Sequence, residues 1–346
     1  MSVNILPIEK FLEQRSMRNA VLFDTRSEKE FEKACIPGAV SLPLLNNEHR
    51  HIIGTIYKEK GREAAVLKGF ELVGPLFHEK LKTVRDLAGE KEVFLYCWRG
   101  GMRSNIMAWL VRMMGMKVTL LENGYKSYRN WVLNQFQQPY KILILGGMTG
   151  SGKTEVLQKL NAIQEQTIDL EYLACHKGSA FGLLGMPEQP RQEYFENLLA
   201  EQLSSVNANE ILWLENESRN IGQITIPEFL FAQMRIAKVV EMEVSTEERS
   251  ARILREYGIF SIHLLEEQTR RIEKRLGGQH MKRAIEFLME NDLHQWLEII
   301  LDYYDKTYTY SNSKRENNTF IKVPFVWTDP EVGVRKLLLA KKQITN

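Results

Sequence analysis

Cys97 is followed by residues that can hold a thiol as a reactive anion. Directly after the apolar run Glu92–Tyr96 comes the stretch Cys97-Trp98-Arg99-Gly100-Gly101-Met102-Arg103-Ser104. A loop between a strand and a helix points several backbone N–H groups at one place, and the helix dipole favours an anion there. We therefore expect Cys97 to be a thiolate nucleophile, with Arg99 and Arg103 as catalytic partners that bind anions. The alternative is a buried structural cysteine at a strand end.

A second loop has the residues that hold phosphate groups. Residues 147–154 match the pattern G-x-x-x-x-G-K-[ST], after the apolar run Lys141–Leu145 and before a helical pattern that begins near Lys153. Backbone N–H groups of such a loop surround a diphosphate, the lysine supplies a point charge, and the threonine hydroxyl can hold Mg²⁺. The residues expected to bind the diphosphate are Gly147, Thr149, Gly150, Ser151, Gly152, Lys153 and Thr154. The motif specifies a diphosphate but no particular base.

A carboxylate is expected to complete a magnesium site beside Thr154. We assign Asp169, which lies at the second apolar run of this region. Glu215 and Glu217, after the run Ile211–Leu214, are alternatives. Each of these acids is also compatible with a solvated loop charge.

The surrounding sequence supplies the strands and helices that both loops require. Short apolar runs in the first part of the chain alternate with helix-like segments and lie at 20–24, 92–96 and 117–121. A second series of runs lies at 141–145, 167–170, 211–214 and 239–244, and a mainly helical, charged pattern follows from Glu247. Strands separated by helices indicate parallel sheets covered on both faces. We therefore predict an α/β fold with two domains, at residues 1–130 and 138–346, the second ending in a helical, partly basic region.

Length and composition exclude several other classes of protein. The 346 residues suit two domains, and 44% hydrophobic with 26% charged residues is typical of globular protein. A net charge of +2 gives no global sign of nucleic-acid binding, so any basic surface must be local. No signal peptide or membrane span is recognisable, and we expect no membrane partner. The three cysteines, Cys35, Cys97 and Cys175, form no CxxC pair, which favours free thiols in the cytoplasm.

The first 130 residues resemble rhodaneses and the related Cdc25-type phosphatases. Besides the cysteine loop, the matching features are Phe23-Asp24-Thr25-Arg26, Glu30-Phe31, Ile36-Pro37-Gly38-Ala39 and Leu42-Pro43. Five residues separate Cys97 from Arg103, as in the phosphatases, whereas many sulfurtransferases have four. The larger loop suits a bigger oxyanion, such as a phosphate-bearing donor. Spacing alone leaves both chalcogen transfer and phosphate hydrolysis open.

Over nearly its full length the chain resembles the tRNA 2-selenouridine synthase family. The resemblance rests on the two loops together with Gly124-Tyr125-Lys126-Ser127-Tyr128-Arg129, His176-Lys177-Gly178-Ser179, Phe181-Gly182, Glu215–Gly222 and Tyr303-Tyr304-Asp305. It implies a rhodanese-like domain followed by a P-loop NTPase-like domain. Lys177 departs from the family pattern, which has arginine there; the charge is kept and the planar fork is lost.

The resemblance implies a two-step reaction on tRNA that carries 2-thiouridine at the wobble position. Geranyl diphosphate first alkylates the sulfur, and selenium from selenophosphate then replaces the S-geranyl group. In this scheme the phosphate loop and Mg²⁺ hold the diphosphate, and Cys97 carries selenium. A groove for the geranyl tail would be lined by Phe181, Leu183, Leu184 and Met186, for which core packing is the alternative.

A tRNA partner requires a local basic surface. Between positions 270 and 283 one acid, Glu273, stands among six basic residues: Arg270, Arg271, Lys274, Arg275, Lys282 and Arg283. We expect this segment to bind the RNA backbone, although it also fits a solvated helical face. Lys126 and Arg129, beside two tyrosines, are further tRNA-binding candidates or, alternatively, anchors of the interdomain linker.

Three other functions remain open from the residues. One is a sulfurtransferase or phosphatase that a P-loop domain regulates. Another is a P-loop kinase with a rhodanese appendage. The third is a tRNA-binding module without catalysis, which would need neither a thiol nor a Mg²⁺ ligand in these positions.

Overall fold

The computed structural model describes residues 3–315 and 320–345. The chain forms two compact units. The first consists of Met1–Gln135 together with Glu196–Ala200, and the second of Phe136–Phe195 together with Glu201–Asn346. Each unit contains a five-stranded sheet and is described by itself.

The sheet of the first unit has the strand order β1-β5-β4-β2-β3, and all its pairings are parallel. The strands are β1 (Asn4–Leu6), β2 (Ala20–Asp24), β3 (Val40–Ser41), β4 (Glu92–Tyr96) and β5 (Val118–Leu121). The cysteine loop leaves the C-terminal end of the central strand β4, which is where parallel sheets usually present ligand-binding loops.

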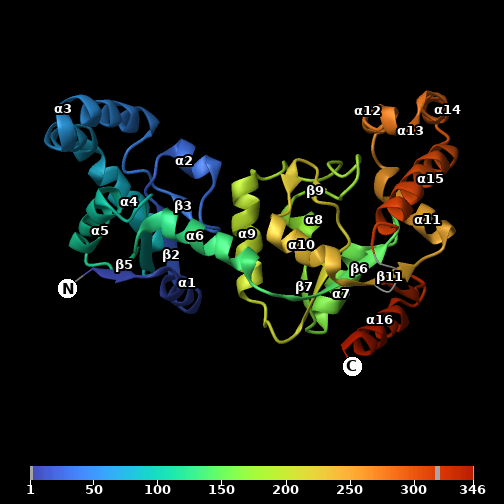
Figure 1. Ribbon diagram of the computed structural model, residues 1–346. Coiled ribbons are helices and arrows are strands. Elements are labelled where there is room, and N and C mark those ends of the chain that lie inside the picture. The colour runs from blue at the N-terminus through green and yellow to red at the C-terminus, as the bar shows by residue number, and fades with distance from the viewer. Residues whose placement is uncertain (1–2, 316–319, 346) are drawn as a thin grey trace. The chain divides into compact units, whose positions relative to one another are not determined.

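Helices cover both faces of this sheet (Figure 1). They are α1 (Ile8–Met17), α2 (Glu28–Lys33), α3 (Asn47–Val73), the short 3₁₀ helix η1 (Gly74–Leu76), α4 (Phe77–Ala88), α5 (Met102–Met113) and α6 (Gly124–Gln137). Side chains of β4 alternate between the faces, as the period of two requires. Val93 and Leu95 join the core with α4 and α5, while Phe94 packs against Phe11 of α1 with ring centroids 5.0 Å apart.

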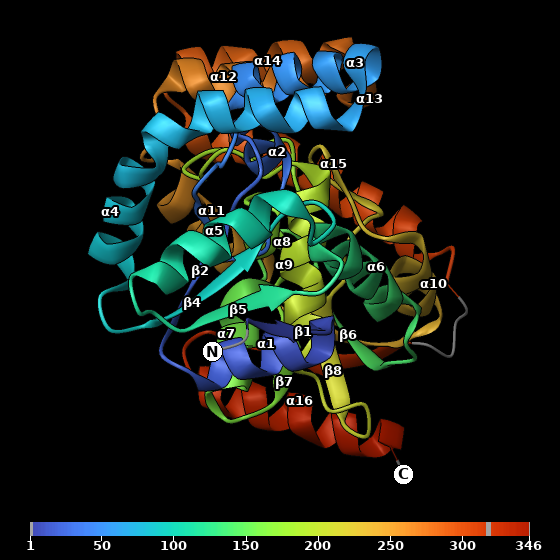
Figure 2. The ribbon, with the colours of Figure 1, turned by 90° about the vertical axis from the view of Figure 1, so that its left-hand side faces the viewer.

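Helix α3 bends at Gly61, whose φ of 83° lies in the left-handed region. Glycine adopts this conformation at little cost because it has no Cβ. Figure 2 shows the two halves of α3 as separate rods.

The sheet of the second unit has the strand order β12-β11-β6-β8-β7, again with parallel pairings. The strands are β6 (Lys141–Gly147), β7 (Gln166–Ile168), β8 (Ile211–Glu215), β11 (Lys238–Glu243) and β12 (Phe320–Pro324). A separate antiparallel pair is formed by β9 (Asn220–Ile221) and β10 (Ile224–Thr225). The phosphate loop follows the central strand β6.

The helices of the second unit build two apolar cores. In the first core, α7 (Lys153–Ala162) and α16 (Pro330–Thr345) pack on the sheet. The second core lies among α11 (Thr246–Tyr257), α12 (Ile262–Arg270), α13 (Glu273–Leu276), α14 (Gly278–Met289) and α15 (Leu293–Asn312). The remaining helices are α8 (Leu170–Leu173), α9 (Gln192–Ser204) and α10 (Glu228–Ile236).

The predicted α/β fold with two parallel sheets is confirmed, and β2 and β4 have the predicted bounds. The strands β1 and β12 were not predicted; both lie at sheet edges. The run 167–170 is only partly a strand, since β7 ends at Ile168 and α8 begins at Leu170. Within residues 3–315 and 320–345, no helix is long and apolar enough to cross a membrane.

Candidate active site

The thiol of Cys97 lies in the predicted loop between β4 and α5 and is buried. The backbone N–H of Gly101 and the hydroxyl of Ser104 both donate to its Sγ, each at 3.2 Å. Two donors at one sulfur are surroundings that can hold a thiolate. The sequence had indicated the backbone donors but not the role of Ser104.

The start of α6 supports the cysteine loop from behind. Tyr125 N–H donates to the Cys97 carbonyl at 2.8 Å, and Lys126 N–H donates to the Trp98 carbonyl at 3.0 Å. Gly124, with φ 57°, packs directly against the backbone of the cysteine loop. A Cβ at this position would be 2.2 Å from the Cys97 carbonyl oxygen. The Gly-Tyr-Lys sequence after β5 therefore belongs structurally to the cysteine site.

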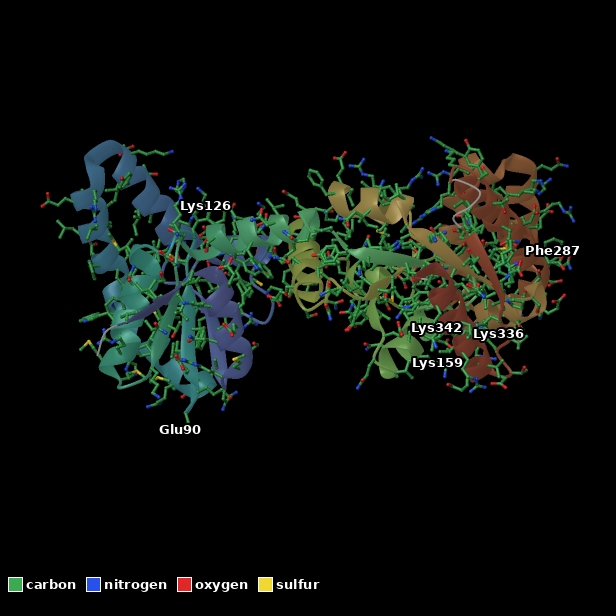
Figure 3. The ribbon with its side chains drawn as sticks, turned by 60° about the horizontal axis from the view of Figure 1, so that its bottom comes forward. Glu90, Lys126, Lys159, Phe287, Lys336 and Lys342 are labelled. Atoms are coloured by element: carbon green, nitrogen blue, oxygen red, sulfur yellow. The ribbon has the colours of Figure 1, made fainter. Side chains whose placement is uncertain are left out.

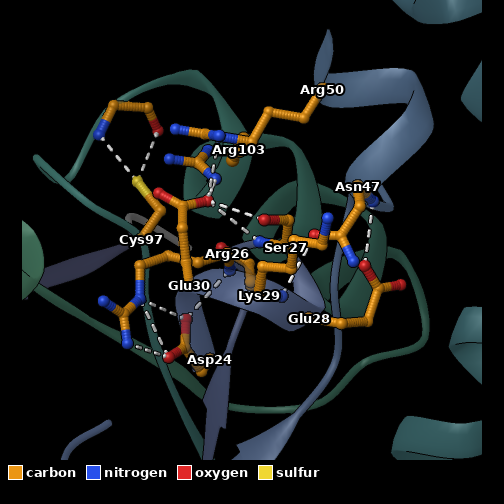
Figure 4. A network of polar contacts seen from close by, with 12 residues as sticks. Asp24, Arg26, Ser27, Glu28, Lys29, Glu30, Asn47, Arg50, Cys97 and Arg103 are labelled. Carbon is orange, nitrogen blue, oxygen red and sulfur yellow. Dashed lines mark hydrogen bonds and ion pairs between the residues drawn. The ribbon is translucent and has the colours of Figure 1, made fainter. Parts of the chain in front are cut away.

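Glu30 of α2 holds two arginines beside the thiol (Figure 4). Arg103 donates to Glu30 Oε2 at 2.7 Å, and Arg50 Nε lies 3.2 Å from the same oxygen. Burial alone would raise the pKa of Glu30, but the hydrogen bond and charge of Arg103 outweigh it, so that pKa is lowered. Arg99 is exposed at the rim. The structure thus brings the three predicted catalytic residues together.

A cavity of about 290 Å³ opens over this loop. Its walls are Cys97, Trp98, Arg99, Gly101, Met102 and Arg103. It therefore combines a thiol and two positive charges with two apolar side chains.

The phosphate loop of the second unit is held by contacts along its length. Lys153 Nζ donates to the Gly147 carbonyl at 3.1 Å, and the Gly147 N–H donates to the Tyr308 hydroxyl at 2.8 Å. Arg249 of α11 donates to the Thr149 carbonyl at 3.1 Å and makes a double contact with Asp305 of α15, at 2.7 and 2.8 Å. Asp305 belongs to the Tyr-Tyr-Asp motif noted in the sequence. The structure shows that this aspartate holds the arginine that contacts the phosphate loop.

The indole of Trp327 lies against the same loop. Its Nε1–H donates to the Ser151 carbonyl at 3.0 Å, and the guanidinium of Arg252 stacks 3.8 Å from the centre of the ring. A Cβ on Gly152 would be 2.3 Å from Trp327, so only glycine fits there. Neither Trp327 nor Arg252 stood out in the sequence because each is distant from the motif along the chain.

Three glutamates face the lysine of the phosphate loop. Thr154 Oγ1 lies 3.5 Å from Glu171 Oε2, and Glu171 N–H donates to Glu215 Oε2 at 3.2 Å. A Cβ on Gly178 would lie 2.6 Å from Glu171 Oε1 and 3.0 Å from Glu217 Oε2. The carboxylates of Glu215 at the end of β8, Glu217 just after it and Glu171 on α8 therefore meet beside the loop.

The charges of this cluster shift one another's pKa values. Burial lowers the pKa of Lys153, but Glu171 and Glu217 outweigh burial, and the pKa is raised. Burial, followed by the charge of Glu217, raises the pKa of Glu171 to about 8. Burial and the Glu171 charge also hold the pKa of Glu215 well above its usual range. The cluster carries fewer negative charges at neutral pH than its composition suggests.

The oxygen-rich surroundings of Thr154 fit a magnesium ion. The buried atoms Ser151 Oγ and Glu215 Oε1 have no hydrogen-bond partner in the part of the chain that the structure describes. Within that part no three His, Cys, Asp or Glu side chains form a metal-binding group. Mg²⁺ beside a phosphate loop takes only one or two carboxylates, the remaining ligands being phosphate oxygens and water.

Asp169, the acid assigned to the metal from the sequence, caps α8. Its Oδ1 accepts a hydrogen bond from Tyr172 N–H at 2.7 Å. Glu171, two residues further on, was missed in the sequence and lies beside the Thr154 hydroxyl. The pattern of an Asp cap directly after a strand could have shown that the chain turns here and brings Glu171 inward.

The apolar residues considered for a geranyl groove divide into two pairs. Phe181 and Leu184 are buried in the core of the α11–α15 region, where Phe181 packs edge-on against Trp296 with centroids 5.6 Å apart. Leu183 and Met186 are half-buried. Core packing therefore accounts for the first pair.

The two tRNA-binding candidates on α6 have different surroundings. The Lys126 side chain is exposed (Figure 3). Arg129 is half-buried and donates to Glu196 Oε2 and Asn197 Oδ1, both within the first unit. The anchoring role considered for Arg129 agrees with these contacts.

The basic segment 270–283 is only partly neutralised. Arg270 pairs with Glu266 at 2.6 Å, and Arg271 pairs with Glu267 at 3.1 Å, one helical turn earlier. Lys274 and Arg275 are exposed, and the described residues give them no ion pair. Arg283 of α14 is likewise exposed without an ion pair among the described residues, so the unpaired positive charge of the segment lies on α13 and at Arg283.

Two protein-family models match the chain. The model described as a rhodanese-like domain matches residues 8–130, and the model described as the tRNA 2-selenouridine synthase AAA domain matches residues 140–324. The expected rhodanese-like and P-loop domains, in that order, are thereby confirmed.

Several curated proteins are similar over most of their length. The tRNA 2-selenouridine synthase of Cupriavidus pinatubonensis is 36% identical over 332 residues, which cover 85% of this chain and 89% of that protein. The protein of the same name from Pseudomonas putida is 36% identical over 360 residues, covering 93% and 95%. This chain therefore belongs to the tRNA 2-selenouridine synthase family.

Proposed function

We propose that this protein is a transferase that converts 2-thiouridine at the tRNA wobble position to 2-selenouridine. The observation that carries the proposal is the presence in one chain of a buried cysteine with two hydrogen-bond donors and a complete phosphate loop with a buried lysine. The names of the similar proteins support the product. The cytoplasmic location expected from the free cysteines belongs to the same proposal.

In the first step the thiocarbonyl sulfur of the tRNA attacks C1 of geranyl diphosphate, the C–O bond breaks and diphosphate leaves. The base loses its N3 proton to solvent, which gives the neutral S-geranyl product. Lys153 and the backbone N–H groups of the loop would bind the diphosphate and stabilise its developing charge. Thr154 and Glu171, with Asp169, Glu215 and Glu217 nearby, would hold Mg²⁺, which neutralises further charge when bound.

In the second step Cys97 acts on selenophosphate. Attack of its thiolate on phosphorus forms an S–P bond, breaks the P–Se bond and releases selenide, with no change in oxidation state. Selenide then replaces the geranyl thiolate at C2 of the base, and water returns Cys97 by releasing phosphate. Attack on selenium would instead expel phosphorus at the phosphite level. The electron count therefore favours a role for Cys97 in releasing selenide from selenophosphate. The resemblance had instead implied that Cys97 carries the selenium.

The test is mass spectrometry of anticodon nucleosides after incubation of thiolated tRNA with the protein, geranyl diphosphate and selenophosphate. We expect 2-selenouridine with both co-substrates and S-geranyl-2-thiouridine without selenophosphate. Lys153→Ala should give neither product, because the diphosphate site is lost, while circular dichroism shows it folded. Unmodified tRNA alongside turnover of thiosulfate or of a phosphate ester would instead establish a sulfurtransferase or a phosphatase.

A further inference from the structure

Trp98 is an exposed aromatic side chain directly beside the reactive thiol. It retains 38% of its accessible surface, and Met102, which also lines the cavity, retains 45%. Loop N–H groups and arginines suffice to bind a phosphate-bearing donor. An indole at the mouth of the cavity serves a different part of the reaction.

The indole is supported from within the first unit. Its ring centroid lies 5.8 Å from that of Tyr125, which is fully buried. Arg26 stacks 3.8 Å from the centre of the Tyr125 ring and is held by Asp24 through contacts at 2.7 to 3.0 Å. The Trp98 carbonyl is fixed by Lys126 N–H. The ring is thus held in place before any ligand arrives, while part of it stays open.

We propose that Trp98 is the platform on which the uracil ring of the target nucleotide stacks during selenium transfer. This assignment rests on the proposed function. A base whose C2 atom must reach the cysteine loop has to leave the anticodon stack, and proteins receive such bases on aromatic side chains. The cavity of about 290 Å³ beside Trp98 has room for a single base next to the thiol. Trp98 is a positioning residue, since the chemistry takes place at Cys97.

The test measures selenium transfer to S-geranylated tRNA and, separately, release of selenide from selenophosphate without tRNA. For Trp98→Ala we expect KM for the tRNA to rise on the order of tenfold or more, from loss of one stacking contact. Trp98→Phe should stay within about threefold of wild type because it keeps an aromatic face. Selenide release and geranylation should be unchanged in both variants. Trp109→Ala, on α5 and 55% exposed outside the cavity, is the matched control.

Trp98→Leu separates stacking from simple apolar contact. Stacking predicts that it behaves like Trp98→Ala, and wild-type KM for Trp98→Leu would overturn the assignment. Loss of selenide release in Trp98→Ala would also overturn it, because Trp98 would then act on the donor or on the loop. If the wild type is active and Trp98→Ala has the wild-type KM for tRNA, only this assignment is wrong. A wild type that makes no 2-selenouridine sinks the proposed function as well.

Discussion

Two hydrogen-bond donors reach Cys97 Sγ, and the proposed function uses this atom as a thiolate nucleophile. A serine hydroxyl stays protonated near neutral pH, so the same loop cannot make it a nucleophile. In the proposed function, alkylation of the tRNA sulfur uses the diphosphate site and no protein thiol. The two steps should therefore be separable at one residue.

Cys97→Ser is expected to abolish 2-selenouridine and to leave geranylation largely intact, so that S-geranyl-2-thiouridine accumulates. Nucleoside mass spectrometry measures both products in one sample. Cys35→Ser and Cys175→Ser are matched controls and should stay active. Full selenouridine from Cys97→Ser would remove the thiol from the mechanism, and loss of both products would show that one site serves both steps.

Glu171 gives the second unit a pH-dependent stability. Its folded pKa of about 8 lies above the ordinary value of 4.5, so between these pH values the folded carboxyl keeps a proton that the unfolded chain has lost. The contribution of Glu171 to the free energy of unfolding is therefore complete below pH 4.5. It falls as the pH rises toward 8, by at most about 1.4 kcal/mol per pH unit.

Glu171→Gln should flatten this fall, since an amide does not ionise. Urea unfolding of wild type and variant at several pH values between 5 and 9, with a metal chelator present, measures it. Glu210→Gln, in an exposed loop before β8, is the control and should follow wild type. Equal slopes for wild type and Glu171→Gln would show that Glu171 is ionised in the folded protein.

Helix α13 presents two exposed basic residues of the segment 270–283, Lys274 and Arg275, that have no ion pair among the described residues. At the C-terminal end of α12, Arg270 and Arg271 form ion pairs with glutamates one helical turn earlier, whereas Lys274 and Arg275 on α13 form none among the described residues. Each lysine or arginine that binds an RNA phosphate releases counterions and steepens the salt dependence of binding.

The double variant Lys274→Glu/Arg275→Glu should weaken tRNA binding and lower the slope of log Kd against log salt by about two units. Filter binding at several salt concentrations measures the slope. Arg270→Glu/Arg271→Glu should change it less. Arg85→Glu on α4 makes the same kind of charge change and should leave it unaltered. A slope that is the same in every variant would mean that α13 does not touch the RNA.

The strands that position the two loops could be predicted because each is an uninterrupted apolar run along its length. The runs AVLFD and EVFLY are bounded by charged or polar segments and became β2 and β4. The edge strand β1 has three residues and an exposed start, so its pattern resembles a loop. The site itself was predicted where a motif is local, as at Cys97 and Lys153. Glu171, Arg249 and Trp327 reach the phosphate loop only through tertiary structure, which no local pattern records.

At the scale of the whole molecule, five residues of α9 belong to the first unit. Asn197 is completely buried there, and its Nδ2–H₂ group donates to the Cys35 carbonyl at 2.8 Å and to the Tyr125 hydroxyl at 2.9 Å. Tyr125 in turn supports the cysteine loop. The first unit is therefore completed by a segment far along the chain.

Asn197→Ala should destabilise the first unit by about 1–3 kcal/mol, the cost of removing one partner of buried hydrogen bonds. The rate at which a thiol reagent labels the buried Cys35 in dilute urea reports opening of the first unit, and labelling of the half-buried Cys175 is the reference in the second unit. Only the former should rise. Asn209→Ala, at an exposed position before β8, should change neither rate. Unchanged Cys35 labelling in Asn197→Ala would show that the α9 segment is dispensable.

The same segment constrains how the protein is made. The ribosome produces residues 1–135 first, but Glu196–Ala200 follows only after residues 136–195 have been added. At about 5–20 residues per second this interval lasts several seconds. During it the newly made first unit lacks the amide group of Asn197, and the cysteine loop lacks its final support. The order of synthesis thus delays completion of the thiol site until much of the phosphate-loop unit, including the loop itself, already exists.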